Sequence, residues 1–355
     1  MDKQKKIVIG ISIGDLNGIG SEVVLKTLED PRILELFTPV IFASLKIMTY
    51  FKKTYNLEGN LHGIDNLDLI VENKINVFNV WKESVNVNFG KEDPKIGEYA
   101  IKSLKSSVLA LKNNKIDVLV TAPINKSNIQ AEDFQFPGHT DYLNQELEGK
   151  SLMLLISGDL RVGLLTDHVA VKDVSQNITK ERIESKIITI EETLIKDFGI
   201  RKPKIAVLGI NPHNGDNGVI GNEDDTVLRP TLEEIYKNGT LVYGPYAADS
   251  FFGSGNYLKF DAVIASYHDQ GLIPFKTLSF GKGVNFTAGL NKIRTSPDHG
   301  TAFDVAGKNI ANYDSFSEAL YTAINIYKKR KEFENLTKNP LKVTTPPKTT
   351  RKRFD

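Results

Sequence analysis

The stretch IVIGISIGDLNGIGSEVVLKTL, residues 7–28, contains the structural unit that the rest of the chain repeats. Residues 7–13 are almost continuously apolar, as is typical of a strand buried on both faces of a sheet. A glycine-containing turn follows, and Ser21 with Glu22 then begins a segment that predicts a helix over residues 21–28. A buried strand followed by a turn and a helix is the repeating unit of α/β proteins.

The same alternation continues along the chain. The strand candidates are short runs rich in Val, Ile and Leu: residues 7–13, 40–43, 118–121, 152–156, 162–166, 205–208 and 262–265. The helix candidates are longer segments: residues 21–28, 97–111, 180–198, 230–237 and 315–331. This pattern predicts an α/β fold with a largely parallel sheet. No G-x-G-x-x-G follows a strand, so the Rossmann fingerprint is absent from the sequence.

The chain has 355 residues and a formal net charge of +1, which is unevenly distributed. Residues 338–355 carry six basic side chains and one acidic one, and the remaining chain carries 39 basic and 43 acidic residues. This balance argues against a protein that coats nucleic acid. The proline- and lysine-rich end predicts a flexible basic tail over residues 336–355.

The composition also limits the chemistry and the location of the protein. The chain contains no cysteine, so thiolate nucleophiles and cysteine-ligated metals are excluded. The N-terminal apolar run is too short to span a membrane, and no small-residue cleavage site follows it. We therefore expect a cytoplasmic protein that does not associate with membranes.

The residues Gly10-Ile-Ser12-Ile-Gly14 match G-x-S-x-G, the nucleophile elbow of esterases. They lie in the first apolar run of the chain, with no preceding strand to build a hydrolase sheet. We therefore interpret them as part of a structural strand. A hydrolase with Ser12 as nucleophile is the alternative, which labelling by a fluorophosphonate probe would support.

Three histidines directly follow strand candidates: His168 ends VGLLTDH, His213 ends IAVLGINPH and His268 ends AVIASYH. Ligands of open α/β sheets bind at the carboxyl ends of strands, and three imidazoles there would hold a divalent metal. The alternative for each is a hydrogen-bonded histidine at the start of a loop. His62 lies in the polar segment NLHGID and is interpreted as a surface residue.

Further polar residues suit an anionic ligand. His139 and Thr140 precede a predicted helix, whose N-terminus would favour a phosphate, although simple capping of the helix by Thr140 is the favoured interpretation from these residues alone. Lys276, Asn285 and Arg294 follow later, among glycine-rich turns. Such cations would bind carboxylate or phosphate, and the alternative is that they lie in solvated loops.

Several segments together resemble the 4-hydroxythreonine-4-phosphate dehydrogenase family. The matching segments are GDLNGIGSE (14–22), VTAPINK (120–126), FPGHTDYL (136–143), TDHVAVKDV (166–174), LGINPHNGDNGVIGNED (208–224), GPYAADSFF (244–252), DAVIASYHDQGLIPFK (261–276) and GKGVNFTAGLNKIRTSPDHGTAFDVAGK (281–308). The resemblance covers about residues 7–330. The first loop departs from the family pattern, because it lacks the usual prolines while it keeps an acidic residue at Asp15.

The resemblance implies the two-domain isocitrate/isopropylmalate dehydrogenase-like fold, with a cleft between two α/β domains. The first domain would comprise residues 1–125 and 285–335, including the cofactor loop. The second, residues 126–284, would carry the metal ligands and the dimer interface. The resemblance also implies a homodimer in which the third metal-binding histidine comes from the neighbouring subunit.

The resemblance assigns roles to individual residues. The metal ligands would be His168, His213 and His268, holding one divalent ion (Zn, Mg, Mn or Co) per subunit, with Asp249 in a secondary role nearby. The substrate contacts would be His139, Thr140, Lys276, Asn285 and Arg294. The loop HGTAFDVAGKNIAN (299–312) resembles the cofactor loop of isopropylmalate and isocitrate dehydrogenases. By that comparison the adenosine end of NAD would be lined by His299, Gly300, Ala302, Asp304 and Asn312. The acid at Asp304 favours NAD over NADP, because it suits free ribose hydroxyls and repels a 2′-phosphate.

The implied reaction is the NAD-dependent, metal-assisted oxidation of 4-phosphooxy-L-threonine to 2-amino-3-oxo-4-phosphooxybutanoate. This β-keto acid would lose CO2 to give 3-amino-2-oxopropyl phosphate in pyridoxine 5′-phosphate biosynthesis. The proton acceptor is open between Lys276, a water molecule and a path through Asp269. A dehydrogenase of threonate or erythronate 4-phosphate is the near alternative, and a non-enzymatic metal- or phosphate-binding module is the distant one.

Overall fold

The computed structural model describes residues 6–130, 134–136 and 138–341. In these residues the strands form one twelve-stranded sheet. The strands are β1 (Ile7–Ser12), β2 (Phe37–Ala43), β3 (Leu61–Ile64), β4 (Ile75–Asn79), β5 (Val118–Thr121), β6 (Gly149–Ser157), β7 (Leu160–Leu164), β8 (Ile205–Leu208), β9 (Val242–Tyr246), β10 (Ala262–Ala265), β11 (Val284–Leu290) and β12 (Ile293–Pro297).

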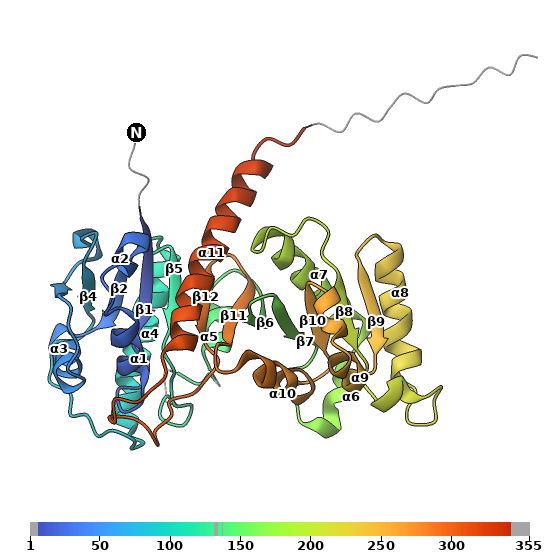
Figure 1. Ribbon diagram of the computed structural model, residues 1–355, viewed down its shortest axis with the longest axis horizontal. Helices are drawn as coiled ribbons and strands as arrows, with labels where there is room; N and C mark the ends of the chain where they lie inside the picture. The colour runs from blue at the N-terminus through green and yellow to red at the C-terminus, as the bar shows by residue number, and fades with distance from the viewer. Residues whose placement is uncertain (1–5, 131–133, 137, 342–355) are drawn as a thin grey trace, which may run out of the picture.

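The strand order is β3-β4-β2-β1-β5-β12-β11-β6-β7-β10-β8-β9. The strands from β3 to β12 run parallel to one another, as do the strands from β7 to β9. Antiparallel pairing occurs in the middle, where β11 pairs with β12 and β6, and β6 pairs with β7. Two parallel halves are therefore joined by antiparallel strands, and both halves lie along the longest axis of the molecule (Figure 1).

Helices cover both faces of the sheet. They are α1 (Gly20–Thr27), α2 (Ile33–Leu36), α3 (Leu45–Thr54), α4 (Pro94–Lys112), α5 (His139–Glu146), α6 (Val174–Asn177), α7 (Lys180–Lys196), α8 (Arg229–Lys237), α9 (Ala248–Gly253), α10 (His268–Ser279) and α11 (Asp314–Thr337). Alternate residues of a strand point to opposite faces of the sheet, so each face has its own apolar core. On one face, the core contains residues of α1, α3, α7, α8 and α11. On the other face, α4 and α5 share a core in the first half, while α9 and α10 share one in the second. None of the described helices is long and apolar enough to cross a membrane.

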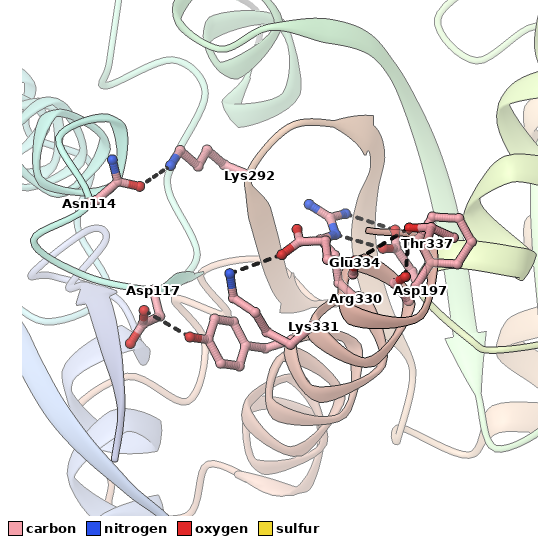
Figure 2. A network of polar contacts seen from close by, with 10 residues as sticks. Asn114, Asp117, Asp197, Lys292, Arg330, Lys331, Glu334 and Thr337 are labelled. Carbon is pink, nitrogen blue, oxygen red and sulfur yellow. Dashed lines mark hydrogen bonds and ion pairs between the residues drawn. The ribbon is translucent and has the colours of Figure 1, made fainter. Parts of the chain in front are cut away.

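Helix α11 connects the two halves (Figure 2). The guanidinium of Arg330 makes a buried bidentate ion pair with Asp197, which follows α7, at 2.7 and 2.8 Å. The hydroxyl of Tyr327, one turn earlier, donates a 3.2 Å hydrogen bond to Asp117, which precedes β5. Asp197 lies in the second half of the sequence and Asp117 in the first, so one helix is attached to both.

The predicted α/β architecture is confirmed, and β5, β8 and β10 coincide with their predicted bounds. The structure corrects the expectation of glycine-rich turns around Asn285 and Arg294, because these residues lie on strands β11 and β12. These are the central strands of the sheet, and their glycines and polar side chains hid the apolar pattern. His62 is likewise a half-buried residue of edge strand β3, not a residue of an exposed loop.

The C-terminal helix is longer than predicted. It continues to Thr337 because ion pairs three residues apart, Lys329–Glu332 and Lys331–Glu334, support its last turns. The predicted tail therefore begins after Thr337 rather than at residue 336, and its residues 342–355 lie outside the described chain. The division into two domains stays a prediction, since a continuous sheet joins the two halves.

Ser12 is the last residue of β1 and is 1% exposed, so its hydroxyl is not presented to solvent. The interpretation of residues 10–14 as a structural segment is confirmed. Gly14, two residues after Ser12, has φ +71°, and a Cβ there would lie 2.2 Å from the carbonyl oxygen of Pro123. The backbone after β1 therefore lies against the backbone after β5. Asp15 strengthens this contact, because its carboxylate accepts from the Asn128 amide at 3.0 Å.

Candidate functional site

A cavity of about 350 Å³ opens where β5, β11 and β12 meet α5 and α10. Figure 1 shows these elements in the middle of the molecule, between the two parallel halves. Its walls include residues from both halves of the sequence, such as Lys126 from the first half and His268 from the second. A cavity of this size and position suits a small polar ligand.

Most residues that the sequence suggested for a ligand line this cavity. All five predicted substrate contacts are present, together with two predicted metal ligands and two predicted cofactor contacts: His139, Thr140, Lys276, Asn285, Arg294, His168, His268, His299 and Gly300. They lie far apart in the sequence, and the sheet topology brings them together. His139 and Thr140 begin α5, Lys276 lies in the last turn of α10, and Asn285 and Arg294 lie on β11 and β12.

Arg294 is the most unusual side chain of the cavity, because it is 2% exposed and none of the described carboxylates lies within ion-pair distance. Among the residues that the structure describes, its guanidinium donates only to neutral oxygens, those of Thr121 and Thr287. Burial lowers the pKa of Arg294 to about 9, so the side chain is still a cation at pH 7. A buried cation without a counter-charge is unfavourable, and an anionic ligand in the cavity would compensate it.

Three buried polar atoms at the cavity have no hydrogen-bond partner among the described residues. They are Nε2 of His139, Oδ1 of Asn285 and Nε2 of His299. Burial, together with the nearby charges of Arg294 and Lys126, holds the pKa of His139 well below its usual range. The ring of His139 is therefore neutral at pH 7. Unpaired buried polar groups cost free energy, and their convergence on one cavity indicates a polar ligand.

The cavity also contains residues that the sequence interpretation had not assigned. Lys126 adds a second ammonium group beside Lys276, while Asp141 and Asp298 supply carboxylates. Thr121, the last residue of β5, orients Arg294. Thr121 and Lys126 could have been found from the sequence, because Thr121 ends a strand candidate and Lys126 lies in the loop that follows it, where ligands of α/β sheets bind.

The predicted metal ligands are only partly brought together. His168 and His268 line the cavity, and Nδ1 of His268 lies 2.7 Å from Oδ1 of Asp269. His213 does not line it, but lies in the turn Pro212–Gly215 with a left-handed φ of 53°. Within the described residues of one chain, no group of three or more His, Asp or Glu side chains is arranged to hold a metal. One chain thus offers two imidazoles at the cavity, a donor set that fits a divalent ion if a further donor comes from elsewhere.

The other predicted residues lie outside the cavity lining. Asp249 is exposed in the first turn of α9, and Asp269 is exposed in the first turn of α10. Ala302 and Asp304 lie in the loop after β12, where Ala302 has a left-handed φ of 44°. The side chain of Asn312 accepts a 2.7 Å hydrogen bond from the backbone N–H of Asp314 at the start of α11. The roles assigned to these residues stay predictions.

Known proteins were compared with this chain. Residues 35–323 match the family described as pyridoxal phosphate biosynthetic protein PdxA. A 4-hydroxythreonine-4-phosphate dehydrogenase of Bacteroides thetaiotaomicron is 46% identical over 96% of this chain and 94% of its own length. A protein of Oceanobacillus iheyensis, provisionally named D-threonate 4-phosphate dehydrogenase, is 36% identical over 91% of this chain and 98% of its own. The crystal structure of a 4-hydroxythreonine-4-phosphate dehydrogenase from Burkholderia phymatum, 34% identical, superposes with a TM-score of 0.75 over 91% of this chain and 99% of that one.

Proposed function

The chain belongs to the PdxA family of pyridoxal phosphate biosynthetic proteins, and we propose that it oxidises 4-phosphooxy-L-threonine with NAD and a divalent metal. The C3 hydroxyl would lose its proton and C3 would lose a hydride to NAD, giving 2-amino-3-oxo-4-phosphooxybutanoate and NADH. This β-keto acid would then release CO2 to yield 3-amino-2-oxopropyl phosphate. The step would serve pyridoxine 5′-phosphate biosynthesis.

The observation that carries this proposal is the uncompensated cation of Arg294 in a cavity with unpaired polar atoms. The substrate has a phosphate and a carboxylate, which are the groups that a buried guanidinium binds best. Lys276 and Lys126 would share these negative charges. His139 and Thr140 at the start of α5 would complete the phosphate contacts, since the N-terminus of a helix favours an anion.

The same residues would contribute to catalysis mainly by holding the substrate in a fixed position. Neutral His139 can donate or accept a hydrogen bond without adding charge, and Asn285 presents a free amide oxygen to the ligand. A divalent ion held by His168, His213 and His268 would act as a Lewis acid at the reacting hydroxyl and at the new carbonyl. Lys276 lines the cavity and would accept the hydroxyl proton only as a neutral amine, in which case Arg294 and Lys126 would hold the anionic groups without it. Asp269 contacts His268 and would act through that ring.

The loop of residues 299–312 is proposed to bind NAD. His299 supports this role, because its Nε2 is buried, unpaired and adjacent to the substrate cavity. Gly300 next to it carries no side chain that would block a ligand. Ala302, Asp304 and Asn312 would then contact the adenosine end, with Asp304 selecting NAD over NADP.

A homodimer is part of the proposal, because one chain does not assemble the three histidines. Helix α10 carries His268 at its first residue, and Ile273 on the same helix is 64% exposed. Phe280, directly after the helix, is 85% exposed. Apolar side chains of this size suit a contact with a second copy. Such a contact along α10 would bring a second subunit next to His268, and the metal site would be shared.

A dehydrogenase of threonate or erythronate 4-phosphate is the second candidate. The name of the relative from Oceanobacillus iheyensis favours it, and both substrates present the same phosphate and carboxylate. They differ at C2, where one has an amino group and the other a hydroxyl. The cavity offers Asp141 and Asp298 as partners for an ammonium, but both also accept hydrogen bonds from a hydroxyl.

The test is NADH formation with 4-phosphooxy-L-threonine and with D-threonate and D-erythronate 4-phosphates, measured side by side. We expect the aminated substrate to give the largest kcat/KM and a chelator to abolish turnover. A larger kcat/KM with either sugar acid phosphate would replace the first proposal by the second. Higher kcat/KM with NADP than with NAD would overturn the cofactor assignment, and binding without turnover of any candidate would favour a binding module.

A further inference from the structure

Helix α1 and the loop of residues 299–312 are joined by a buried ion pair that the site described above does not use. Glu22 and Lys26 lie one turn apart on α1, and Nζ of Lys26 lies 2.7 Å from Oε1 of Glu22. The side chain of Glu22 is 0% exposed and that of Lys26 is 15% exposed. Glu22 is therefore enclosed by the protein, and Lys26 is largely covered by it.

Both charges are directed at the backbone of the loop. Oε1 of Glu22 accepts a 2.8 Å hydrogen bond from the backbone N–H of Ala311. Nζ of Lys26 donates to the carbonyl oxygens of Asn309 and Ala311, at 3.0 and 3.4 Å. Hydrogen bonds to charged groups are stronger than those between neutral groups, and the one between Glu22 and Ala311 is buried. The pair thus binds a backbone N–H group and two backbone carbonyl groups in one turn of the loop.

The turn is irregular. Asn309 has a left-handed φ of 59°, a conformation that Asn adopts more readily than most residues other than glycine. Its side-chain amide donates to the carbonyl of Tyr55 at 3.3 Å, a long hydrogen bond. The first part of the loop is fixed from the same segment of chain, since the backbone N–H of Ile19 donates to Thr301 at 3.0 Å. Residues 19–26 therefore hold the loop at both of its ends.

From these contacts we propose that Glu22 and Lys26 are positioning residues, which set the loop of residues 299–312 in the conformation that binds the dinucleotide. The inference rests on the proposed role of that loop in NAD binding. The pair touches neither the substrate cavity nor any predicted metal ligand, and it acts on Ala311, the residue directly before Asn312. Its effect should therefore fall on the cofactor and leave the phosphorylated substrate largely unaffected.

Lys26→Met tests the proposal, because it keeps the length and apolar stem of the side chain while it removes the ammonium group. We expect the KM for NAD to rise about tenfold, because the loop residues that bind NAD would be displaced. The KM for 4-phosphooxy-L-threonine should change less than about twofold. NADH binding, followed by its fluorescence, should weaken by the same factor. Hydrogen–deuterium exchange of the backbone at residues 309–312 should become faster.

Glu22→Gln is the conservative second variant, since the amide oxygen can still accept from Ala311. We expect it to retain more NADH affinity than Lys26→Met. Thr27→Val is the matched control: Thr27 lies on the same helix and contacts Ser317 at 3.1 Å, away from the turn at residues 309–311. It should lower the melting temperature without changing NADH affinity or exchange at residues 309–312.

The outcomes separate this inference from the proposed function. If the wild-type protein uses NAD but Lys26→Met leaves both NADH affinity and exchange unchanged, the positioning role is wrong. The role is also wrong if Thr27→Val weakens NADH binding as much as Lys26→Met does. If the wild-type protein binds no NADH at all, the proposed cofactor is wrong, whereas faster exchange in Lys26→Met would still show that the pair holds the loop.

Discussion

The hydroxyl of Thr121 accepts two hydrogen bonds from the guanidinium of Arg294, from Nε at 3.0 Å and from Nη2 at 2.6 Å. Thr121 ends β5, and Arg294 lies on the neighbouring parallel strand β12. Thr287 on β11 accepts from Nη1 at 3.2 Å. Three central strands thus orient one buried cation, and the guanidinium keeps further N–H donors for an anionic ligand.

Thr121→Val should weaken substrate binding. The replacement has a similar volume but removes the acceptor, so the guanidinium of Arg294 loses two hydrogen bonds and its fixed orientation. We expect the KM for the phosphorylated substrate to rise about tenfold, the equivalent of about 1.4 kcal/mol, with a smaller change in kcat. Steady-state kinetics at saturating NAD measures this. Thr295→Val is the matched control, because Thr295 lies next to Arg294 on β12 but donates to Ala319 of α11. An equal rise of the KM in both variants would contradict the prediction.

Substrate binding should depend on pH through Arg294. Because burial lowers the pKa of its guanidinium to about 9, the free protein loses this charge above that pH. The KM should therefore rise as the pH passes about 9, since an anionic ligand binds only the charged form. His139 should cause no change between about pH 6.5 and 8, because its pKa lies well below 6.5. Titration of substrate binding by calorimetry from pH 6.5 to 10.5 checks both. A constant affinity up to pH 10.5 would contradict the predicted loss of this charge.

The site shows which of its properties can be read from a sequence. His139, Lys276 and Arg294 could be selected because cations and helix-initiating residues suit anions, and the structure places all three around one cavity. That Arg294 is buried without a carboxylate partner could not be predicted, because it depends on the pairing of β12 between β5 and β11. The pairing joins segments more than 150 residues apart, and apolar periodicity contains no information on such contacts.

The same limit applies to the fold. Strands with continuous apolar runs, such as β5 and β10, were predicted with correct bounds because burial on both faces leaves a clear composition. Strands β11 and β12 contain Asn285, Arg294 and Ser296, which serve the cavity instead of the core. Polar residues that line the cavity therefore interrupt the apolar pattern of the strands closest to the proposed ligand site.

The buried ion pair between Arg330 and Asp197 should be important for stability. Arg330→Met would leave the carboxylate of Asp197, whose side chain is 2% exposed, without a counter-charge. We expect a loss of about 3–5 kcal/mol in the free energy of unfolding, measured by urea denaturation. The double variant Arg330→Met with Asp197→Leu should recover much of this loss, because it leaves no buried charge. Tyr327→Phe is the control, since it removes one hydrogen bond to Asp117 from the same helix and should cost about 1 kcal/mol.

Mixed dimers test the shared metal site. His213→Ala and His268→Ala should each lose bound metal and activity as pure proteins, whereas His62→Ala, on edge strand β3, should lose neither. If either His213 or His268 is contributed across the interface, a dimer of one subunit of each variant contains one site with both defects and one intact site. Coexpression with two affinity tags, followed by tandem purification, isolates this mixed dimer. Its metal content should be about half that of the wild-type dimer, with activity in proportion.

The result distinguishes two arrangements of the histidines. If all three came from one chain, every site of the mixed dimer would carry one substitution, and no activity would return. The structure makes the shared arrangement the expected one, because His213 lies outside the cavity that His168 and His268 line, and no described group of three His, Asp or Glu side chains assembles within the chain. Recovered activity with restored metal would therefore establish both the ligand set and the dimer, whereas full metal content in pure His213→Ala would remove His213 from the set.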